Sequence, residues 1–307
     1  MQRGIGAVET MQELLPEWAA VVAALLTQLG DFWFLALLLF VLYWAKASEG
    51  DDVVLVGGIL LAATGVYRTL KRTFELPRPN KPLLDPELLP SLVRPFYEAT
   101  AFASGYGFPS GHATSAAVVY FGLAAVLTVW DRRLRYAVAA GLVTIVGLTR
   151  VVLGFHYLVD IVAGVAVGLG LVWLGLRGIN VIDDDRVTIM LFVAIATSVT
   201  YFRASGGSEE AILLSGATLG LFGGWQLVVL AREAVAAPLP AAALRPVALR
   251  GGLAALSLGP LVVALGGLLL RSGEPFAMAG LAGLGAAVIL LVPVARQSRR
   301  LVAAAGF

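Results

Sequence analysis

The chain contains no cysteine, and only 14% of its 307 residues are charged. Without cysteine there are no disulfide bonds, thiolate metal sites or cysteine nucleophiles, and the redox compartment stays undefined. Histidine is nearly absent as well, with two copies, His112 and His156. The net charge of +2 is too small to indicate a nucleic-acid partner. In so apolar a chain an ionisable side chain is costly, so the two histidines are the first candidates for chemistry.

The shortage of charge predicts a protein of the lipid bilayer. A soluble domain carries about 25% charged residues, whereas this chain has 14% charged residues, 59% hydrophobic residues and a mean hydropathy of +0.88. Since a helix needs roughly 20 apolar residues to cross a membrane, the sequence predicts an all-α, polytopic helix bundle with about nine spans. The predicted spans are residues 31–46, 52–73, 110–130, 135–153, 157–177, 187–203, 210–231, 249–270 and 276–295.

The N-terminal region does not have the pattern of a signal peptide. Glu9, Glu13 and Glu17 precede the apolar stretch, where a basic segment would be expected. The chain is therefore expected to insert through uncleaved helices. The segment from Leu14 to Gly30 is short and contains Pro16, which favours an interfacial helix over a tenth, imperfect span. The expected organisation is an interfacial helix in residues 1–30, a catalytic bundle in 31–178 and a membrane extension in 179–307.

The basic residues between the spans indicate the orientation of the bundle. Lysine and arginine gather in cytoplasmic loops, and with nine alternating spans most of them fall on one side. That set comprises Lys46, Arg132, Arg133, Arg135, Arg177, Arg186, Arg232, Arg245, Arg250, Arg296, Arg299 and Arg300, with Arg203 and Arg271 as isolated exceptions. The loop 75–109 and the turn at Gly154 then lie on the opposite, extracytoplasmic side.

The first group of polar residues lies at the end of the second predicted span. Lys71 and Arg78 are nearly two helical turns apart, and Pro79 is expected to end the helix. Arginine offers a planar fork for two phosphate oxygens, while lysine offers a point charge. The alternative is that these cations, with Arg68 and Arg72, only extend toward the membrane surface. Cations on the extracytoplasmic side argue against this, because they oppose the charge bias of the other loops.

The second group opens the third predicted span with the sequence Pro109-Ser110-Gly111-His112. Ser110 is a good N-cap, and the free amides of the first turn form a site for phosphate oxygens. Gly111 permits close approach of a ligand to the backbone. His112 can donate a proton to a leaving oxygen. The alternative is an ordinary capped helix with an interfacial histidine.

The third group is the most specific of the three. Arg150 ends one predicted span, Gly154 breaks the chain, and His156 begins the next span, with Asp160 four residues later on the same helical face. A carboxylate in that place fixes the imidazole tautomer and leaves the other ring nitrogen free to attack phosphorus. A purely structural His–Asp pair is the alternative, but it leaves Arg150 unexplained.

In order along the chain, the three blocks read KRTFELPRP from Lys71, PSGH from Pro109 and TRVVLGFHYLVD from Thr149. They resemble the phosphatidic acid phosphatase type 2 (PAP2) superfamily, whose signature is KxxxxxxRP, PSGH and SRxxxxxHxxxD. One position departs from this signature, Thr149, which keeps the hydroxyl of the expected serine. The resemblance covers roughly residues 31–178.

The resemblance implies a role for each motif residue. His156 is the nucleophile that forms a phosphohistidine, Asp160 orients it, and His112 is the general acid for the leaving group. The phosphoryl oxygens are held by Lys71, Arg78, Ser110, the amide of Gly111, and Arg150. The family requires no metal or other cofactor, so none is expected.

The region from Val187 to the C-terminus lies outside the resemblance. It contains four predicted spans rich in alanine, glycine and leucine, and pairs such as Gly216 and Gly220 suit close helix packing. We expect a scaffold or a homo-oligomer interface there, with a lateral wall for a lipid tail as the alternative.

Together these features predict a metal-independent lipid phosphate phosphatase at the extracytoplasmic face of the plasma membrane. Aromatic residues near the motifs suit an amphiphile whose tail stays in the bilayer: Phe96, Tyr97, Phe102, Tyr106 and Phe108. Polyprenyl diphosphate, phosphatidic acid and phosphatidylglycerol phosphate are the family substrates that fit. One alternative is a sugar-phosphate phosphatase, because glucose-6-phosphatase belongs to the same superfamily and also has nine spans. An anion or lipid transporter is disfavoured, because polar residues crowd one surface and no internal repeat is visible.

The orientation can be tested in the cysteine-free chain. Single cysteines replacing Ser91 and Leu134 lie on opposite sides of the predicted bundle. In intact cells a membrane-impermeant maleimide should label position 91 and not position 134, while both should label after permeabilisation. Labelling confined to position 134 would reverse the orientation.

Overall fold

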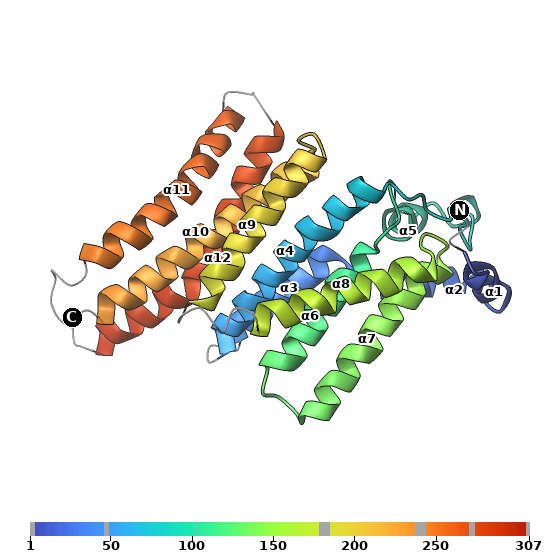
Figure 1. Ribbon diagram of the computed structural model, residues 1–307, viewed down its shortest axis with the longest axis horizontal. Helices are drawn as coiled ribbons and strands as arrows, with labels where there is room; N and C mark the ends of the chain where they lie inside the picture. The colour runs from blue at the N-terminus through green and yellow to red at the C-terminus, as the bar shows by residue number, and fades with distance from the viewer. Residues whose placement is uncertain are drawn as a thin grey trace. The chain divides into compact units, whose positions relative to one another are not determined.

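In the computed structural model, all regular secondary structure in the described residues is helical (Figure 1). The structure describes residues 4–45, 49–102, 104–177, 185–236, 244–269 and 274–304. The chain divides into two compact units, Met1–Val181 and Ile182–Phe307. The expected boundary after residue 178, together with Lys46 and Arg271, falls outside the described residues, as do the side chains of Arg296, Arg299 and Arg300.

The first unit contains a short N-terminal pair of helices, five longer helices and a loop region. Its elements are α1 (Ala7–Glu13), α2 (Ala19–Thr27), η1 (Gln28–Gly30), α3 (Phe32–Ala45), α4 (Gly50–Phe74), η3 (Pro86–Leu88), α5 (Arg94–Ala101), α6 (Gly111–Val126), α7 (Arg132–Val152) and α8 (Leu158–Arg177). The second unit contains α9 (Arg186–Ala204), α10 (Glu209–Ala236), α11 (Leu244–Leu269) and α12 (Glu274–Ala304).

Among the described residues, seven helices are long and apolar enough to cross a bilayer, namely α4, α7, α8, α9, α10, α11 and α12. The chain is thus a multi-pass membrane protein. Each of the nine predicted spans coincides with a helix, but α3 has 14 residues and α6 has 16. At 1.5 Å per residue neither matches a hydrocarbon core of about 30 Å. By length and composition, the described part of the chain therefore has seven candidate spans, or eight if the bent pair of α2–η1 and α3 forms one.

The N-terminal segment forms two short helices, where the sequence predicted one. Pro16 lies in the turn between α1 and α2, and the chain bends by 48° between Ala19–Gly30 and Phe32–Ala45. Asp31 is the residue at this bend. Because α2 and α3 together have the length of a span, this segment is either a broken span or a re-entrant loop.

The short helix α6 lies in the centre of the first unit, between α4, α7 and α8. Most of its residues are buried, so its length is set by protein packing and not by the lipid thickness. Glycines of α8 allow a close approach: a Cβ at Gly164 would lie 2.6 Å from the carbonyl oxygen of Ser110, and one at Gly168 would lie 2.7 Å from that of Thr114. This close packing fixes the start of α6 against the start of α8.

The second unit is held together at one end by a polar cluster. Arg250 Nη1 of α11 lies 2.8 Å from Asp185 Oδ2 at the N-cap of α9 and donates to Gln226 Oε1 of α10 over 3.0 Å. Trp225 Nε1 donates to the other oxygen of Asp185 over 3.1 Å. Three helices are thereby connected through one partly buried guanidinium and one carboxylate.

Close packing of α10 on α12 depends on glycine. A Cβ at Gly216 would lie 2.5 Å from the carbonyl oxygen of Ala279, and one at Gly220 would lie 1.9 Å from that of Gly283. The small residues that the sequence suggested for helix packing are thus used inside the chain, between α10 and α12.

Replacing Gly220 by alanine should force these two helices apart. We expect the substitution to destabilise the protein by about 1–3 kcal/mol, the usual cost of overpacking a tight core. Gly285→Ala is the matched control, since a Cβ there meets nothing within 4 Å and alanine favours the helix. Thermal unfolding in detergent should show a lower midpoint for Gly220→Ala only. Equal midpoints would contradict the close contact.

Candidate active site

The three sequence blocks come together where the ends of four helices meet. Lys71 near the end of α4 donates from Nζ to the carbonyl oxygen of Tyr106 over 2.9 Å, which connects α4 to the loop before α6. The Ser110 amide at the start of α6 donates to the carbonyl oxygen of Asp160 in α8 over 2.9 Å. Arg150 near the end of α7 leads through a short turn to His156. The predicted convergence of the blocks is therefore present.

The first block departs from the sequence prediction in where its helix ends. α4 ends at Phe74, and Glu75 takes a left-handed conformation with φ of 51°. The expectation that Pro79 ends the helix is wrong, since the chain has already left the helix when it reaches Pro77. Arg78 is consequently a loop residue, free to cross to the turn before α8. Lys71 remains on the helix.

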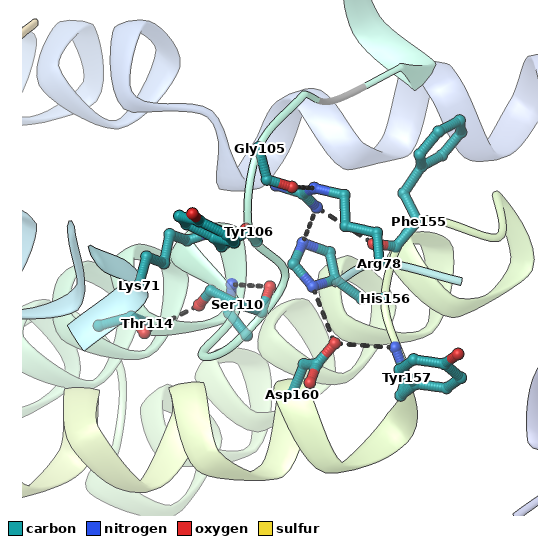
Figure 2. A network of polar contacts seen from close by, with 11 residues as sticks. Lys71, Arg78, Gly105, Tyr106, Ser110, Thr114, Phe155, His156, Tyr157 and Asp160 are labelled. Carbon is teal, nitrogen blue, oxygen red and sulfur yellow. Dashed lines mark hydrogen bonds and ion pairs between the residues drawn. The ribbon is translucent and has the colours of Figure 1, made fainter. Parts of the chain in front are cut away.

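Arg78 makes three contacts that join separate loops (Figure 2). Its Nε donates to the carbonyl oxygen of Gly105 over 3.1 Å, and Nη1 donates to that of Phe155 over 3.1 Å. Nη1 also lies 2.7 Å from Nε2 of His156. Burial lowers the pKa of Arg78 to about 10, so the guanidinium stays charged at neutral pH.

The contact with Arg78 determines the tautomer of His156. A guanidinium has only donors, so Nε2 of the imidazole accepts and the ring proton lies on Nδ1. Nδ1 is 3.4 Å from Asp160 Oδ2. The His156 ring is 2% exposed. Burial first, and then the positive charge of Arg78, keep the pKa of His156 well below its usual value, so the ring is neutral at pH 7.

Asp160 supports this arrangement from the first turn of α8. Its side chain is fully buried, and Oδ2 also accepts from the amide of Tyr157 over 3.0 Å. His156 itself precedes α8, which begins at Leu158. The predicted four-residue contact is present, but His156 belongs to the turn and not to the helical face that the sequence suggested.

In the second block Ser110 caps the helix as predicted, and Gly111 has a packing role that the sequence did not indicate. The Ser110 hydroxyl accepts from the amide of Ala113 over 3.4 Å, and Ser110 is fully buried. The Thr114 hydroxyl donates to the Ser110 carbonyl oxygen over 2.8 Å. A Cβ at Gly111 would lie 2.8 Å from the ring of Tyr67 in α4. Gly111 therefore permits close approach of α4 as well as an open first turn.

His112 faces a residue that no motif contains. Its Nε2 lies 3.0 Å from Asp31 Oδ1, without the alignment of a hydrogen bond. The side chains of His112 and Asp31 are 23% and 28% exposed. Asp31 was missed because it is distant in sequence from every block. A carboxylate inside an apolar stretch is the one signal that pointed to it.

Arg150 is buried beneath the site, with 1% of its surface exposed. Its Nη1 donates to the Thr27 hydroxyl over 3.3 Å and to the Thr100 carbonyl oxygen over 3.4 Å. Thr149 directs its hydroxyl to the Val146 carbonyl oxygen over 2.7 Å, within its own helix. The hydroxyl of Thr149, which replaces the serine of the family signature, therefore points away from the partners of Arg150.

The N-terminal helix α1 holds the loop after α4 and the turn after α7 in place. Gln12 Nε2 donates to the carbonyl oxygens of Lys81, over 2.8 Å, and Val152, over 3.0 Å. The Lys81 amide donates to the Gly154 carbonyl oxygen over 3.1 Å. Gly154 has φ of 76°, and a Cβ there would lie 1.7 Å from the Lys81 carbonyl oxygen. Only glycine fits this turn, which places His156.

A cavity of about 380 Å³ lies beside the turn that carries His156. Its lining residues are Asn80, Pro82, Phe102, Ser104 and Phe155. The carbonyl oxygen of Phe155 is a partner of Arg78, so the cavity adjoins the cationic groups. Of the predicted aromatic residues, Phe102 lines this cavity, while Tyr97 is buried and packs beside Phe102. Among the described residues no group of three histidine, aspartate or glutamate side chains has the arrangement of a metal site.

Three comparisons show which known proteins the chain resembles. Residues 52–182 match the model of the PAP2 superfamily. The chain is 34% identical over 88 residues, 27% of its own length, to phosphatidylglycerophosphatase B of Bacillus subtilis, and the match spans 43% of that relative. The crystal structure of a transmembrane PAP2 type phosphatidylglycerolphosphate phosphatase from Bacillus subtilis matches 58% of this chain and 85% of that one, with 25% identity and a TM-score of 0.45. The segment that matches the family model contains all three blocks of the site, so in this region the chain is similar to the PAP2 superfamily.

Proposed function

We propose that the protein is a metal-independent lipid phosphate phosphatase that acts through a phosphohistidine on His156. One observation carries this proposal. His156 is buried with Nδ1 toward a carboxylate and Nε2 toward a guanidinium, 3.4 Å from Asp160 and 2.7 Å from Arg78. The neutral ring therefore presents its lone pair at a cationic site, which is what attack on a phosphate requires.

The first chemical step forms an N–P bond. The phosphate oxygens replace His156 as partners of Arg78, which exposes the Nε2 lone pair to phosphorus. Nε2 attacks, the P–O bond to the lipid breaks, and the leaving oxygen takes the bonding electrons. His112 supplies the proton to that oxygen. Asp160 stabilises the positive charge that develops on the ring of His156.

The phosphoryl oxygens are stabilised by groups already in place. Lys71, Arg78 and Arg150 supply positive charge, and the first turn of α6 supplies the hydroxyl of Ser110 and the amide of Gly111. Because they are held by the fold before the substrate arrives, they need little reorganisation in the transition state. Such positioning and charge stabilisation are the main requirements of phosphoryl transfer.

The second step releases phosphate. Water attacks the phosphohistidine, and His112, now neutral, accepts a proton from it. The N–P bond breaks, its electron pair returns to Nε2, and inorganic phosphate leaves. His112 is then protonated again and ready for the next cycle, so the two steps need no external base.

Three observations favour a lipid phosphate as substrate. The site lies at the ends of membrane helices, a cavity with Phe102 and Phe155 adjoins the cations, and the relative that matches over 88 residues is named phosphatidylglycerophosphatase B. Phosphatidylglycerol phosphate is therefore the first candidate, with phosphatidic acid and polyprenyl diphosphate next. The distribution of lysine and arginine supports the extracytoplasmic face of the plasma membrane as the place of this chemistry.

The two histidines should fail in different ways when replaced. His156→Ala removes the attacking nitrogen, so no phosphoenzyme should form from any substrate. His112→Ala should lose about 10²–10⁴-fold in rate on an alkyl phosphate, the usual contribution of a general acid. It should lose much less on p-nitrophenyl phosphate, whose leaving group needs no proton. The phosphoenzyme should be trapped by rapid quenching without acid, and mapping of its base-stable phosphate should locate the phosphoryl group on His156. Phosphate on His112 would reverse the assignment.

The substrate class and the absence of a metal requirement can be measured together. Purified full-length protein in detergent with EDTA should release phosphate from short-chain phosphatidylglycerol phosphate or phosphatidic acid, and vanadate should inhibit. Glucose 6-phosphate should be a poor substrate, because it lacks an acyl chain. A strict need for added divalent metal would contradict the mechanism, and a preference for glucose 6-phosphate would contradict the lipid substrate.

A further inference from the structure

A short N-terminal segment, Thr27–Asp31, touches two of the three motif blocks from outside the family match. Thr27 accepts from Arg150 over 3.3 Å, and Asp31 lies 3.0 Å from His112. Between them, the Leu29 carbonyl oxygen accepts from the hydroxyl of Tyr120 in α6 over 2.7 Å. The region matched by the family model begins at residue 52, so this contribution to the site belongs to the chain's own N-terminal part.

The position of Asp31 is set by close packing of this segment. A Cβ at Gly30 would lie 2.4 Å from Val146 of α7 and 3.4 Å from the Cβ of His112. The Asp31 carbonyl oxygen accepts from the Leu35 amide over 3.0 Å and starts α3, while its amide donates to the Gln28 carbonyl oxygen. The backbone on both sides of Asp31 is therefore fixed, which places its carboxylate beside His112.

The charges around His112 explain what such a carboxylate does. Arg150 of α7 and Lys71 of α4 are cations that act on His112, and Asp31 is the anion that acts on it. Burial of the ring, first, and then the two cations disfavour a protonated imidazole, yet a leaving-group acid must carry a proton before the reaction. A carboxylate 3.0 Å from the ring offsets the cations and favours the protonated form.

We propose that Asp31 is a positioning residue for His112. Asp31 keeps the His112 ring protonated and orients it, so that Nε2 faces Asp31 and Nδ1 faces the leaving oxygen. This inference rests on the proposed role of His112 as general acid. In the step itself Asp31 stays a carboxylate: His112 loses one proton to the leaving oxygen and regains one from water. The missing alignment between the two side chains in the structure is common in catalytic pairs without substrate.

The decisive variant is Asp31→Asn in the full-length protein, compared with Asp51→Asn as a matched control. Asp51 lies exposed in the first turn of α4, at the opposite end of that helix from Lys71. We expect Asp31→Asn to lose about 10- to 100-fold in kcat/KM on dioctanoyl phosphatidic acid, part of the full general-acid effect. On p-nitrophenyl phosphate it should stay within about threefold of the parent, since that leaving group needs little help from an acid. Asp51→Asn should match the parent on both substrates.

Two further measurements separate positioning from general damage to the fold. The alkaline limb of the kcat/KM profile on the lipid should move to lower pH in Asp31→Asn, because Lys71 and Arg150 then oppose the proton on His112 without an anion to offset them. Asp31→Glu keeps the charge and should restore the alkaline limb, even if the shifted carboxylate lowers kcat. In the His112→Ala background, Asp31→Asn should cause no further loss, because the two residues act as one unit.

The outcomes are distinguishable from those of the proposed function. Equal losses on both substrates, an unmoved alkaline limb, or additive losses with His112→Ala would overturn the role of Asp31 while leaving the phosphatase intact. If Asp31→Asn does not fold, the test uses Asp31→Glu. If folded Asp31→Glu does not keep the alkaline limb of the parent protein, the role of Asp31 is overturned. If His112→Ala itself shows no dependence on the leaving group, the acid role fails, and the inference fails with it. If the parent protein itself hydrolyses none of these phosphates, the proposed function is overturned instead.

Discussion

The contact between Arg78 and His156 is the interaction on which the rest of the site depends. The guanidinium cannot accept a hydrogen bond, so its 2.7 Å contact keeps the lone pair of His156 on Nε2 and the proton on Nδ1, toward Asp160. The same contact connects the loop after α4 to the turn before α8. In the resting site Nε2, the nucleophile of the proposed mechanism, is in contact with a cation, and a phosphate oxygen can replace it as the partner of that cation. In that mechanism, the phosphate that binds Arg78 therefore also exposes the nucleophile.

This contact requires two loops to be held at a fixed distance, and the N-terminal region supplies that restraint. Gln12 bonds to carbonyl oxygens of both loops, and Gly154 brings its turn against Lys81 too closely for any side chain. Val8 of α1 packs against Ala113, Val151 and Ile161, at the ends of α6, α7 and α8. The helices α1 and α2 thus belong to the architecture of the site. An interfacial position for this segment, as the sequence suggested, is compatible with such a role.

Much of the site could be predicted from sequence because its residues lie in short blocks at helix ends, where local rules apply. Ser110 caps α6 and Asp160 follows His156 by four residues, so their contacts are set by nearby backbone. The errors arise where a contact joins distant segments. Pro79 does not end α4, because the helix has already ended at Phe74; Gly111 also makes room for Tyr67. Thr27 and Asp31 carry no spacing pattern, since they reach the motifs only through the bend between α2 and α3. The short helices α3 and α6 were counted as full spans, because hydropathy alone does not reveal that α6 is enclosed by protein.

The charges of the assembled site also bear on its substrate. Lys71, Arg78 and Arg150 bring three positive charges close together, whereas Asp160 and Asp31 bring two negative ones, and a membrane interior tolerates such an imbalance poorly. A phosphate monoester carries a charge of about −1.5 to −2 near neutral pH. With neutral His112, the loaded site would be left with an excess of negative charge. A proton on His112, favoured by Asp31, brings the loaded site close to neutrality. In the proposed mechanism, the proton that His112 gives to the leaving group is thus also the one that balances the charge of the substrate, so that binding of a phosphate dianion favours the protonated acid.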